Sequence, residues 1–423
     1  MVSNLRYNPP LILANIDLTA PVSKPSTTLA SLTRLERLQL LAYFAGFIVL
    51  GISAALLGPT LNQLATNTGS TLGDISVLFT MRSVGYLIGA VLSAFLYERF
   101  GGHRVMALAF VGTAISLFFT PVMPTLWLLS AVTLLSRLTG GIIDTGENTL
   151  IVWSLGKRVG PYMNALHLTF GLGAFAAPLL AAWALIQFGG VHAAYWIVAG
   201  LALPVAVFVW RLPNPVRSTD QPTTLPTTSD GVAHVATHKT SAMPLVLILL
   251  FYFFYVGGEV TLGGWLYNYA LATKISDTVG AAALASAFWG AYTLGRLVSI
   301  PASLRWSSMQ ILSTGAVGAV ISAIGMWQAQ GNLWLTWVGV IALGLSMASL
   351  FPTMLAYAET RLTMTGRVTS SIMASASIGA TVTPWLVGQV LGTLGPAAVP
   401  IAALVSAVLM CGVLVGLLRT QTQ

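Results

Sequence analysis

The feature that most constrains this chain is a series of long apolar segments that recurs along almost its whole length. A helix needs about 20 apolar residues to cross the roughly 30 Å hydrocarbon core of a bilayer. Twelve segments come close to that length, so the sequence predicts an all-α membrane protein with twelve transmembrane helices. The segments lie near residues 38–64, 75–98, 104–121, 126–154, 162–187, 192–211, 243–272, 278–303, 308–329, 333–358, 368–393 and 397–418.

The composition excludes several other classes of protein. Charged residues make up only 7% of the chain, whereas a soluble domain carries about 25%. The single cysteine, Cys411, allows neither a disulfide framework nor a cysteine-based metal site. No nucleotide-binding signature is present, which argues against a pump driven by ATP.

The basic residues sort to one side of the predicted membrane. Of the 19 Lys and Arg residues, three lie within the apolar segments, namely Arg82, Arg137 and Arg296. If the segments alternate in direction, fifteen of the other sixteen fall on one side, and only Lys274 falls on the opposite side. Since basic loops stay in the cytoplasm, we expect both termini to be cytoplasmic. The net charge of +8 is then explained by membrane orientation, and no nucleic acid partner is expected.

Two polar segments divide the chain. Residues 1–35 are polar and lack a signal-peptide pattern, so they are expected to form a cytoplasmic tail. Residues 212–241 are rich in Pro, Thr and Ser and read as a cytoplasmic linker. The predicted six-helix halves are therefore residues 36–211 and 242–423.

An internal repeat supports this division. Shifting the chain by 206 residues aligns Gly51, Gly58 and Asn62 with Gly257, Gly264 and Asn268. The same shift aligns a second set, Tyr86, Gly89 and Arg99, with Tyr292, Gly295 and Arg305, and a third set, Gly173 and Pro178, with Gly379 and Pro384. Six-helix halves with both termini on one side are parallel repeats, which enclose a substrate cavity near the midplane.

The loop after the second segment carries a family resemblance. It reads Ala94-Phe-Leu-Tyr-Glu98-Arg99-Phe-Gly101-Gly-His103-Arg104 and resembles the loop signature of the major facilitator superfamily. This chain has Glu in place of the usual Asp and a weakened basic end. The resemblance implies the twelve-helix transporter fold and a gate-latching role for Glu98, Arg99, Gly101 and Arg104.

The fourth segment is the most polar. At about 100° per residue, Arg137, Gly141, Asp144 and Asn148 share one face, with Glu147 on its flank. Ionisable groups at this depth survive mainly beside a cavity or a partner. We interpret Asp144 and Glu147 as a site for a proton or Na⁺. The alternative is a structural ion-pair network that ties this segment to its neighbours.

Aromatic and polar residues combine in the seventh and eighth segments. Such rings stack on the C–H face of a sugar while neighbouring polar groups bond its hydroxyls. The alternatives are that the rings only pack against their neighbours and that Glu259 forms a structural bridge with its charge partner Arg296. The fifth segment carries a lone His167, for which contact with a solute and a packing role are equally compatible with the sequence. The predicted substrate-binding residues are Asn148, His167, Glu259, Trp265, Asn268, Trp289 and Tyr292.

Several short blocks resemble the fucose–galactose–glucose:proton symporter branch, with greatest similarity to sodium-dependent glucose transporter 1-like proteins. They are Asp144-Thr-Gly-Glu147-Asn148, Ser349-Leu-Phe351-Pro352-Thr353, Glu259 to Ala270, and Phe288-Trp289-Gly290 with Gly295-Arg296. The resemblance implies cation coupling by Asp144 and sugar binding by Asn148. The fucose symporters also carry an acid in the first segment, where this chain has none between Gly51 and Asn62.

These observations together predict a secondary transporter of a monosaccharide, a hexose such as glucose, galactose or fucose, driven by H⁺ or Na⁺. An uncoupled sugar uniporter and a transporter of a drug-like or lipid-derived solute are the alternatives. No enzymatic activity is expected, because no nucleophile motif or metal spacing accompanies Asp144, Glu147 and His167. We further expect a monomer in the cell membrane that contacts only its solute and the bilayer. It would need no cofactor, unless Na⁺ serves as the coupling ion.

Overall fold

The computed structural model describes residues 32–215, 243–329 and 331–420, and all regular structure in these ranges is helical. Most of the predicted tail and linker lies outside the described residues. The helices before the linker are α1 (Arg34–Ala55), α2 (Leu57–Thr68), α3 (Leu72–Ile75), α4 (Val77–Arg99), α5 (Gly102–Phe119), α6 (Leu126–Leu155), α7 (Val159–Phe188) and α8 (His192–Arg211). Those after it are α9 (Met243–Ala272), α10 (Thr278–Ser303), α11 (Ser308–Gln328), α12 (Leu333–Met347), α13 (Leu350–Arg361), α14 (Gly366–Leu394) and α15 (Ala398–Arg419).

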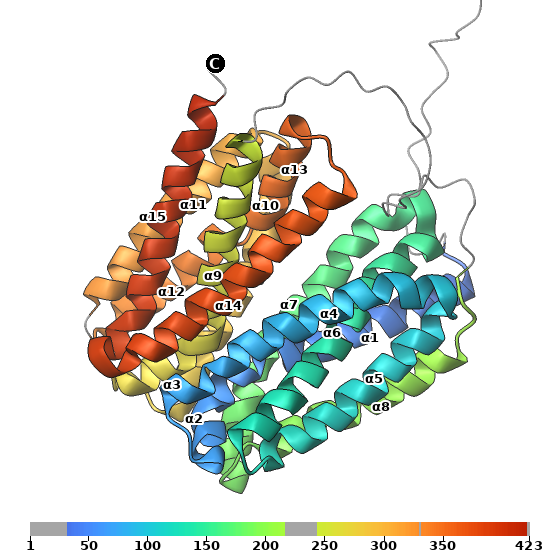
Figure 1. Ribbon diagram of the computed structural model, residues 1–423, viewed down its shortest axis with the longest axis horizontal. Helices are drawn as coiled ribbons and strands as arrows, with labels where there is room; N and C mark the ends of the chain where they lie inside the picture. The colour runs from blue at the N-terminus through green and yellow to red at the C-terminus, as the bar shows by residue number, and fades with distance from the viewer. Residues whose placement is uncertain (1–31, 216–242, 330, 421–423) are drawn as a thin grey trace, which may run out of the picture.

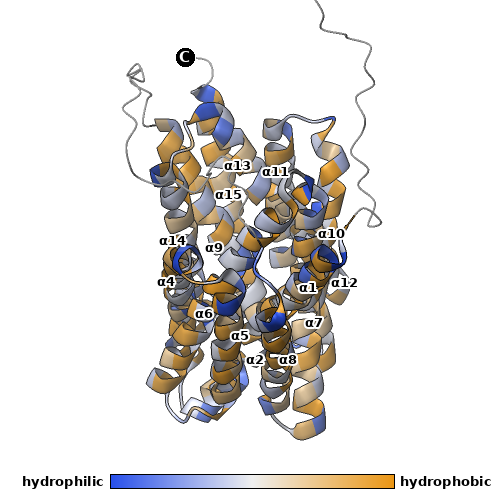
Figure 2. Ribbon diagram, turned by 90° about the vertical axis from the view of Figure 1, so that its right-hand side faces the viewer, coloured by the Kyte–Doolittle hydropathy of each residue, from blue (hydrophilic) through white to orange (hydrophobic). Residues whose placement is uncertain are grey.

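The helices account for the predicted membrane crossings. Ten described segments are long and apolar enough to span a bilayer, and one of them, Gly366–Arg419, contains both α14 and α15. Adding α10, which is rich in Ala and Gly, gives twelve crossings when α1–α2 and α12–α13 are each taken as one interrupted helix. Hydrophobic residues cover the helix surfaces, and hydrophilic residues gather at helix ends and loops (Figure 2). The predicted fold class is confirmed.

The two interruptions coincide with prolines. Pro59 lies in the first turn of α2 and Pro352 in the first turn of α13. A proline fits the first turn of a helix but cannot donate the hydrogen bond that would continue the preceding one. The first and tenth crossings are therefore each interrupted and continue as a second helix.

The 206-residue repeat appears as equivalent helix crossings. α1 packs against α7, α4 against α6 and α5 against α8, while α9 packs against α14, α10 against α12 and α11 against α15. Glycines bring the backbones together at matching positions. A Cβ at Gly173 would lie 2.2 Å from the Ile48 carbonyl oxygen, and one at Gly379 would lie 2.0 Å from that of Phe253. Small residues at such crossings are typical of helix packing in membranes.

The two halves touch mainly through α4–α14, α7–α10 and α2–α9. We call the end where α8 stops and α9 starts the linker end, and the other the opposite end. The halves lie together near α2 and α3, at the opposite end, and diverge toward the linker end (Figure 1). Hydrogen bonds between described residues of the two halves follow this pattern. Asn268 Nδ2 donates to the Gly58 carbonyl oxygen at 3.0 Å, and Gln389 Nε2 donates to that of Gly73 at 2.9 Å.

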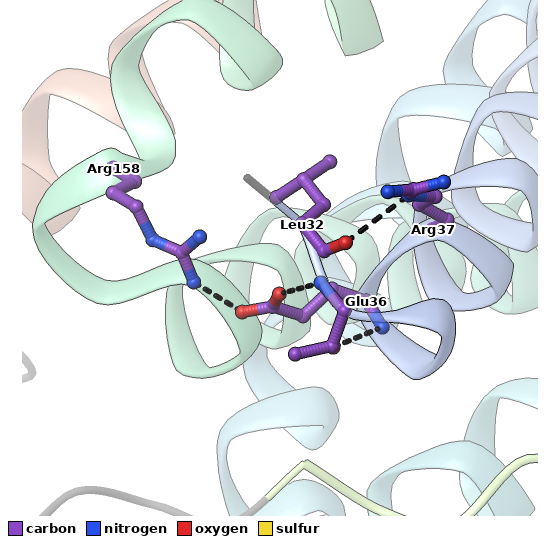
Figure 3. Close-up of polar contacts among 5 residues, drawn as sticks. Leu32, Glu36, Arg37 and Arg158 are labelled. Carbon is purple, nitrogen blue, oxygen red and sulfur yellow. Dashed lines mark hydrogen bonds and ion pairs between the residues drawn. The ribbon is translucent and has the colours of Figure 1, made fainter. Parts of the chain in front are cut away.

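A salt bridge fixes the start of α1 at the linker end. The Thr33 hydroxyl accepts from the Glu36 N–H at 3.2 Å, and the Glu36 carboxylate accepts from the Thr33 N–H at 2.7 Å. This reciprocal capping box leaves the other carboxylate oxygen of Glu36 to pair with Arg158, in the turn between α6 and α7 (Figure 3). The contact ties the first crossing to the fourth and fifth.

Candidate functional site

Asp144 lies on α6, where this helix crosses α4 closely. The Tyr86 hydroxyl of α4 donates to Asp144 Oδ2 at 2.5 Å. Asn148 Nδ2, one turn along α6, donates to Asp144 Oδ1 at 3.1 Å and to its main-chain oxygen at 2.8 Å. Both oxygens of this half-buried carboxylate are therefore held by neutral groups. Charge-assisted bonds of this kind fix the carboxylate in one orientation.

Glu147 points in a different direction from Asp144. It is fully buried, and a Cβ at Gly46 of α1 would fall 1.9 Å from its Oε1. Phe110 of α5 lines the same space. Neither carboxylate oxygen has a hydrogen-bond partner among the described residues. An unpaired carboxylate at this depth is stable only as the neutral acid or with a bound cation. The two predicted cation-coupling residues thus occupy separate environments.

Arg137 makes no ion pair with Asp144. The guanidinium carbon lies 5.8 Å from the centre of the Tyr86 ring, and Nη1 has no hydrogen-bond partner. The salt bridge between Arg158 and Glu36 is the one ion pair within the described ranges. In this conformation Tyr86 lies beside both groups, with its ring near the Arg137 guanidinium and its hydroxyl bonded to Asp144.

A second cluster lies in the other half, on α9 and α10. The Tyr255 and Tyr292 hydroxyls are 2.7 Å apart, and Arg296 Nη2 donates to the Tyr292 hydroxyl at 3.0 Å. Glu259 lies within electrostatic reach of both tyrosines and of Arg296. The alternative of a direct bridge between Glu259 and Arg296 is wrong here, because no ion pair links them. The Trp289 ring packs on Tyr292 with centroids 5.8 Å apart.

His167 lies between the two clusters. It belongs to α7, which packs against α10 of the other half. Its ring is within electrostatic reach of both Arg296 and Asp144, and its edge meets Phe47 at a centroid distance of 5.7 Å. His167 is therefore within electrostatic reach of a charged group from each half.

Trp265 and Asn268 lie toward the opposite end, where the halves meet. Trp265 is fully buried, its Nε1 donates to the Pro384 carbonyl oxygen at 2.9 Å, and its ring lies 5.6 Å from that of Phe79. The paired glycines Gly263 and Gly264 do not unwind α9, which is continuous. Gly264 lets Phe79 of α4 approach α9, and Gly58 lets α2 approach it. We call the contact formed by Gly58, Phe79, Gly264, Trp265 and Asn268 the closed seam.

The predicted gate motif lies at the linker end. Glu98, Arg99 and Arg104 are exposed, and Arg99 lies over the Phe95 ring at 5.9 Å. Gly101 is needed for close packing, since a Cβ there would lie 2.7 Å from Asn214 Nδ2. Within the described part of the chain, none of the three charged residues forms an ion pair in this conformation.

His103 holds the motif together, a role that the sequence analysis did not assign to it. Its Nδ1 lies 3.1 Å from the Leu212 carbonyl oxygen, which can only accept, so Nε2 accepts from the Tyr43 hydroxyl at 2.7 Å. Its main-chain N–H donates to Asn214 Oδ1 at 2.8 Å. These bonds join α5 to α1 and to the segment after α8.

Tyr86 was matched in the repeat but not predicted as a site residue. The 206-residue shift that aligns it with Tyr292 was the available signal. Each tyrosine hydroxyl bonds the charged group of its own half, Asp144 in one case and Arg296 in the other. The repeat therefore preserves a hydroxyl beside an ionisable side chain in both halves.

The sequence model of the Major Facilitator Superfamily matches residues 43–384 of this chain. The chain is 31% identical over 371 residues to the sodium-dependent glucose transporter 1 of Xenopus laevis, covering 81% of this chain and 73% of that protein. It is 29% identical over 384 residues to the Homo sapiens protein of the same name, covering 82% and 72%.

Two solved structures share the fold. The nucleoside transporter NupG matches with a TM-score of 0.71 at 16% identity, over 91% of this chain and 99% of that chain. The D-xylose-proton symporter matches with a TM-score of 0.72 at 11% identity, over 89% and 97%. At these identities the likeness concerns the fold alone.

Proposed function

The chain belongs to the Major Facilitator Superfamily, and from that premise we propose that it is a cation-coupled transporter of a monosaccharide. It is a multi-pass membrane protein with the fold of a transporter and with relatives named as glucose transporters. We propose that the sugar is a hexose and that H⁺ or Na⁺ is the coupling ion. We also propose that the linker end faces the cytoplasm and that the protein lies in the cell membrane. With that orientation, the halves meet at the outer end of the bundle and diverge toward the inner end (Figure 1).

The single observation that carries the proposal is the position of His167. Its ring is within electrostatic reach of a charged group from each half, Asp144 in the first and Arg296 in the second. Alternating access requires a site that both halves share, so that rocking of one half against the other exposes it to each side in turn. The region around His167 meets this requirement near the middle of the bundle.

Coupling is assigned to Asp144, with Glu147 in support. Tyr86 and Asn148 orient the Asp144 carboxylate without neutralising it, which leaves its charge available to a proton or Na⁺. Glu147 is enclosed and unpaired, so it serves as a second group that holds a proton. The described part of α1 supports this assignment, because its one acid, Glu36, is already paired with Arg158.

Sugar binding is assigned to the aromatic side of the second cluster. Trp289 and Tyr292 offer ring faces, and Glu259, Asn148 and His167 offer hydrogen-bonding groups for hydroxyls. Such a mixture suits a hexose better than a wholly apolar solute. Trp265 and Asn268 are buried in the closed seam, and they contact the sugar only when this seam opens.

The substrate is tested by counterflow of labelled hexoses into proteoliposomes. Exchange of glucose, galactose and fucose is compared with exchange of a nucleoside. The variant Trp289→Ala is compared with the control Trp334→Ala, because the Trp334 side chain is 80% exposed. We expect hexose exchange that Trp289→Ala weakens and Trp334→Ala leaves unchanged. Exchange of the nucleoside without any hexose exchange would contradict the proposal.

An uncoupled sugar uniporter is the second candidate. The absence of an acid between Gly51 and Asn62 favours it, because the fucose symporters carry one in that segment. Hexose exchange together with no response of net uptake to Na⁺ or pH gradients would select it.

A further inference from the structure

A second pair of charges lies inside the first half, away from the region shared by the two halves. Arg82 of α4 and Arg137 of α6 line one small cavity among α1, α2, α4, α5, α6 and α8. All the residues that line it belong to the first half. Rocking of the halves therefore leaves the cavity intact, and the sugar does not enter it.

The cavity has an excess of positive charge. Arg82 Nη2 donates to the Ala54 carbonyl oxygen at 2.7 Å, whereas Nη1 of Arg137 is buried and has no hydrogen-bond partner among the described residues. No acid lines the cavity. The neighbouring acid Asp144 is already held by Tyr86 and Asn148. Two guanidinium groups that share a low-dielectric cavity repel each other and favour a negative charge between them.

The remaining polar lining consists of hydroxyl groups. Those of Ser53 and Thr120 donate to carbonyl oxygens three and four residues earlier in the chain, and that of Tyr195 is hydrogen-bonded to the Thr60 hydroxyl at 2.8 Å. Thr133 and Ser136 line the cavity as well. No bond to another described side chain occupies their hydroxyls, which remain free to donate. Two guanidinium groups and two hydroxyls form a set of donors without a competing anion.

The size of the cavity limits the ligand. The space open to the centre of a water molecule is about 20 Å³. One water needs roughly 10–15 Å³ on this measure, so the cavity admits a single small species and excludes acetate, phosphate and gluconate. We propose that this cavity binds one monatomic anion, chloride under physiological conditions, between Arg82 and Arg137. The anion stabilises the first half by neutralising the repulsion between the two arginines.

The test is thermal unfolding of the purified full chain at constant sodium concentration, with chloride replaced stepwise by gluconate. We expect the unfolding midpoint to rise with chloride and to saturate, and bromide to act in the same way. Arg137→Gln should weaken the apparent chloride affinity about tenfold or more, because it removes one of two charges that hold the anion. Thr133→Val should weaken it less. Arg305→Gln removes an exposed arginine of the other half and should leave the chloride response unchanged.

A second measurement does not depend on any variant. Anomalous diffraction from wild-type crystals grown in bromide should place a peak between the Arg82 and Arg137 side chains. A water in the cavity with no bromide peak would overturn the proposal. So would an unfolding midpoint that is the same in chloride and gluconate, or an Arg137→Gln protein whose chloride response equals that of the wild type.

Discussion

Gly58→Ala is the most informative perturbation of the conformation described above, because its added methyl group meets only backbone atoms of the other half. The new Cβ would lie 2.7 Å from the Gly263 carbonyl oxygen and 2.8 Å from that of Gly264. Real side chains do not make contacts this short, and a main-chain oxygen cannot move away by changing rotamer. The strain is relieved only if the halves separate at the closed seam.

The magnitude follows from the cost of overpacking. Inserting one methyl group into a tight contact costs about 1–3 kcal/mol. All of that cost falls on the conformation with the seam closed, so the equilibrium should move away from it by about 5- to 150-fold. The conformation open at the opposite end should become correspondingly more populated.

The assay measures the distance between spin labels across the opposite end. Thr66 on α2 and Thr393 on α14 are exposed and suit labelling, in a background where the single cysteine is replaced by Cys411→Ser. Gly200→Ala is the matched control, because nothing lies within 4 Å of its added Cβ. We expect longer label distances in Gly58→Ala and the wild-type distribution in Gly200→Ala. A wild-type distribution in Gly58→Ala would refute the reasoning.

Two further substitutions test individual hydrogen bonds. Tyr86→Phe removes the hydroxyl that donates to the Asp144 carboxylate. Because a hydrogen bond to a charged group contributes about 1.5–3 kcal/mol, the Na⁺ or H⁺ concentration for half-maximal uptake should shift about tenfold or more. An unshifted concentration dependence would show that this bond has no role in coupling. His103→Ala removes two side-chain hydrogen bonds worth about 1 kcal/mol each, so it should lower the unfolding midpoint measurably. The control His192→Ala, at the opposite end of the bundle, should lower the midpoint less. Equal midpoints for the two variants would contradict the assigned role of His103.

The crossings and the repeat could be predicted from the sequence because they depend on local properties. The length of an apolar segment is set by the thickness of the bilayer, and the 206-residue shift repeats glycines wherever two backbones must approach. Gly173 and Gly379 illustrate this, since each contacts the matching helix in its own half.

The internal geometry of the site could not be predicted in the same way. Helical spacing placed Glu147 on the flank of the Asp144 face, but the direction of its side chain depends on the small Gly46 of a different helix. His103 gave no periodic signal, because its partners, Tyr43 and Leu212, are 60 and 109 residues away. Trp265 and Asn268 were predicted beside a substrate, and their burial in the closed seam depends on which end of the bundle is closed.

The most direct test of cation coupling at Asp144 compares exchange with accumulation in the same proteoliposomes. Asp144→Asn keeps the shape of the side chain and removes its charge, and Glu359→Gln, an exposed surface acid, is the control. We predict that Asp144→Asn still exchanges hexose but no longer accumulates it when a Na⁺ or H⁺ gradient is imposed, whereas Glu359→Gln behaves as the wild type. Wild-type accumulation by Asp144→Asn would contradict the account.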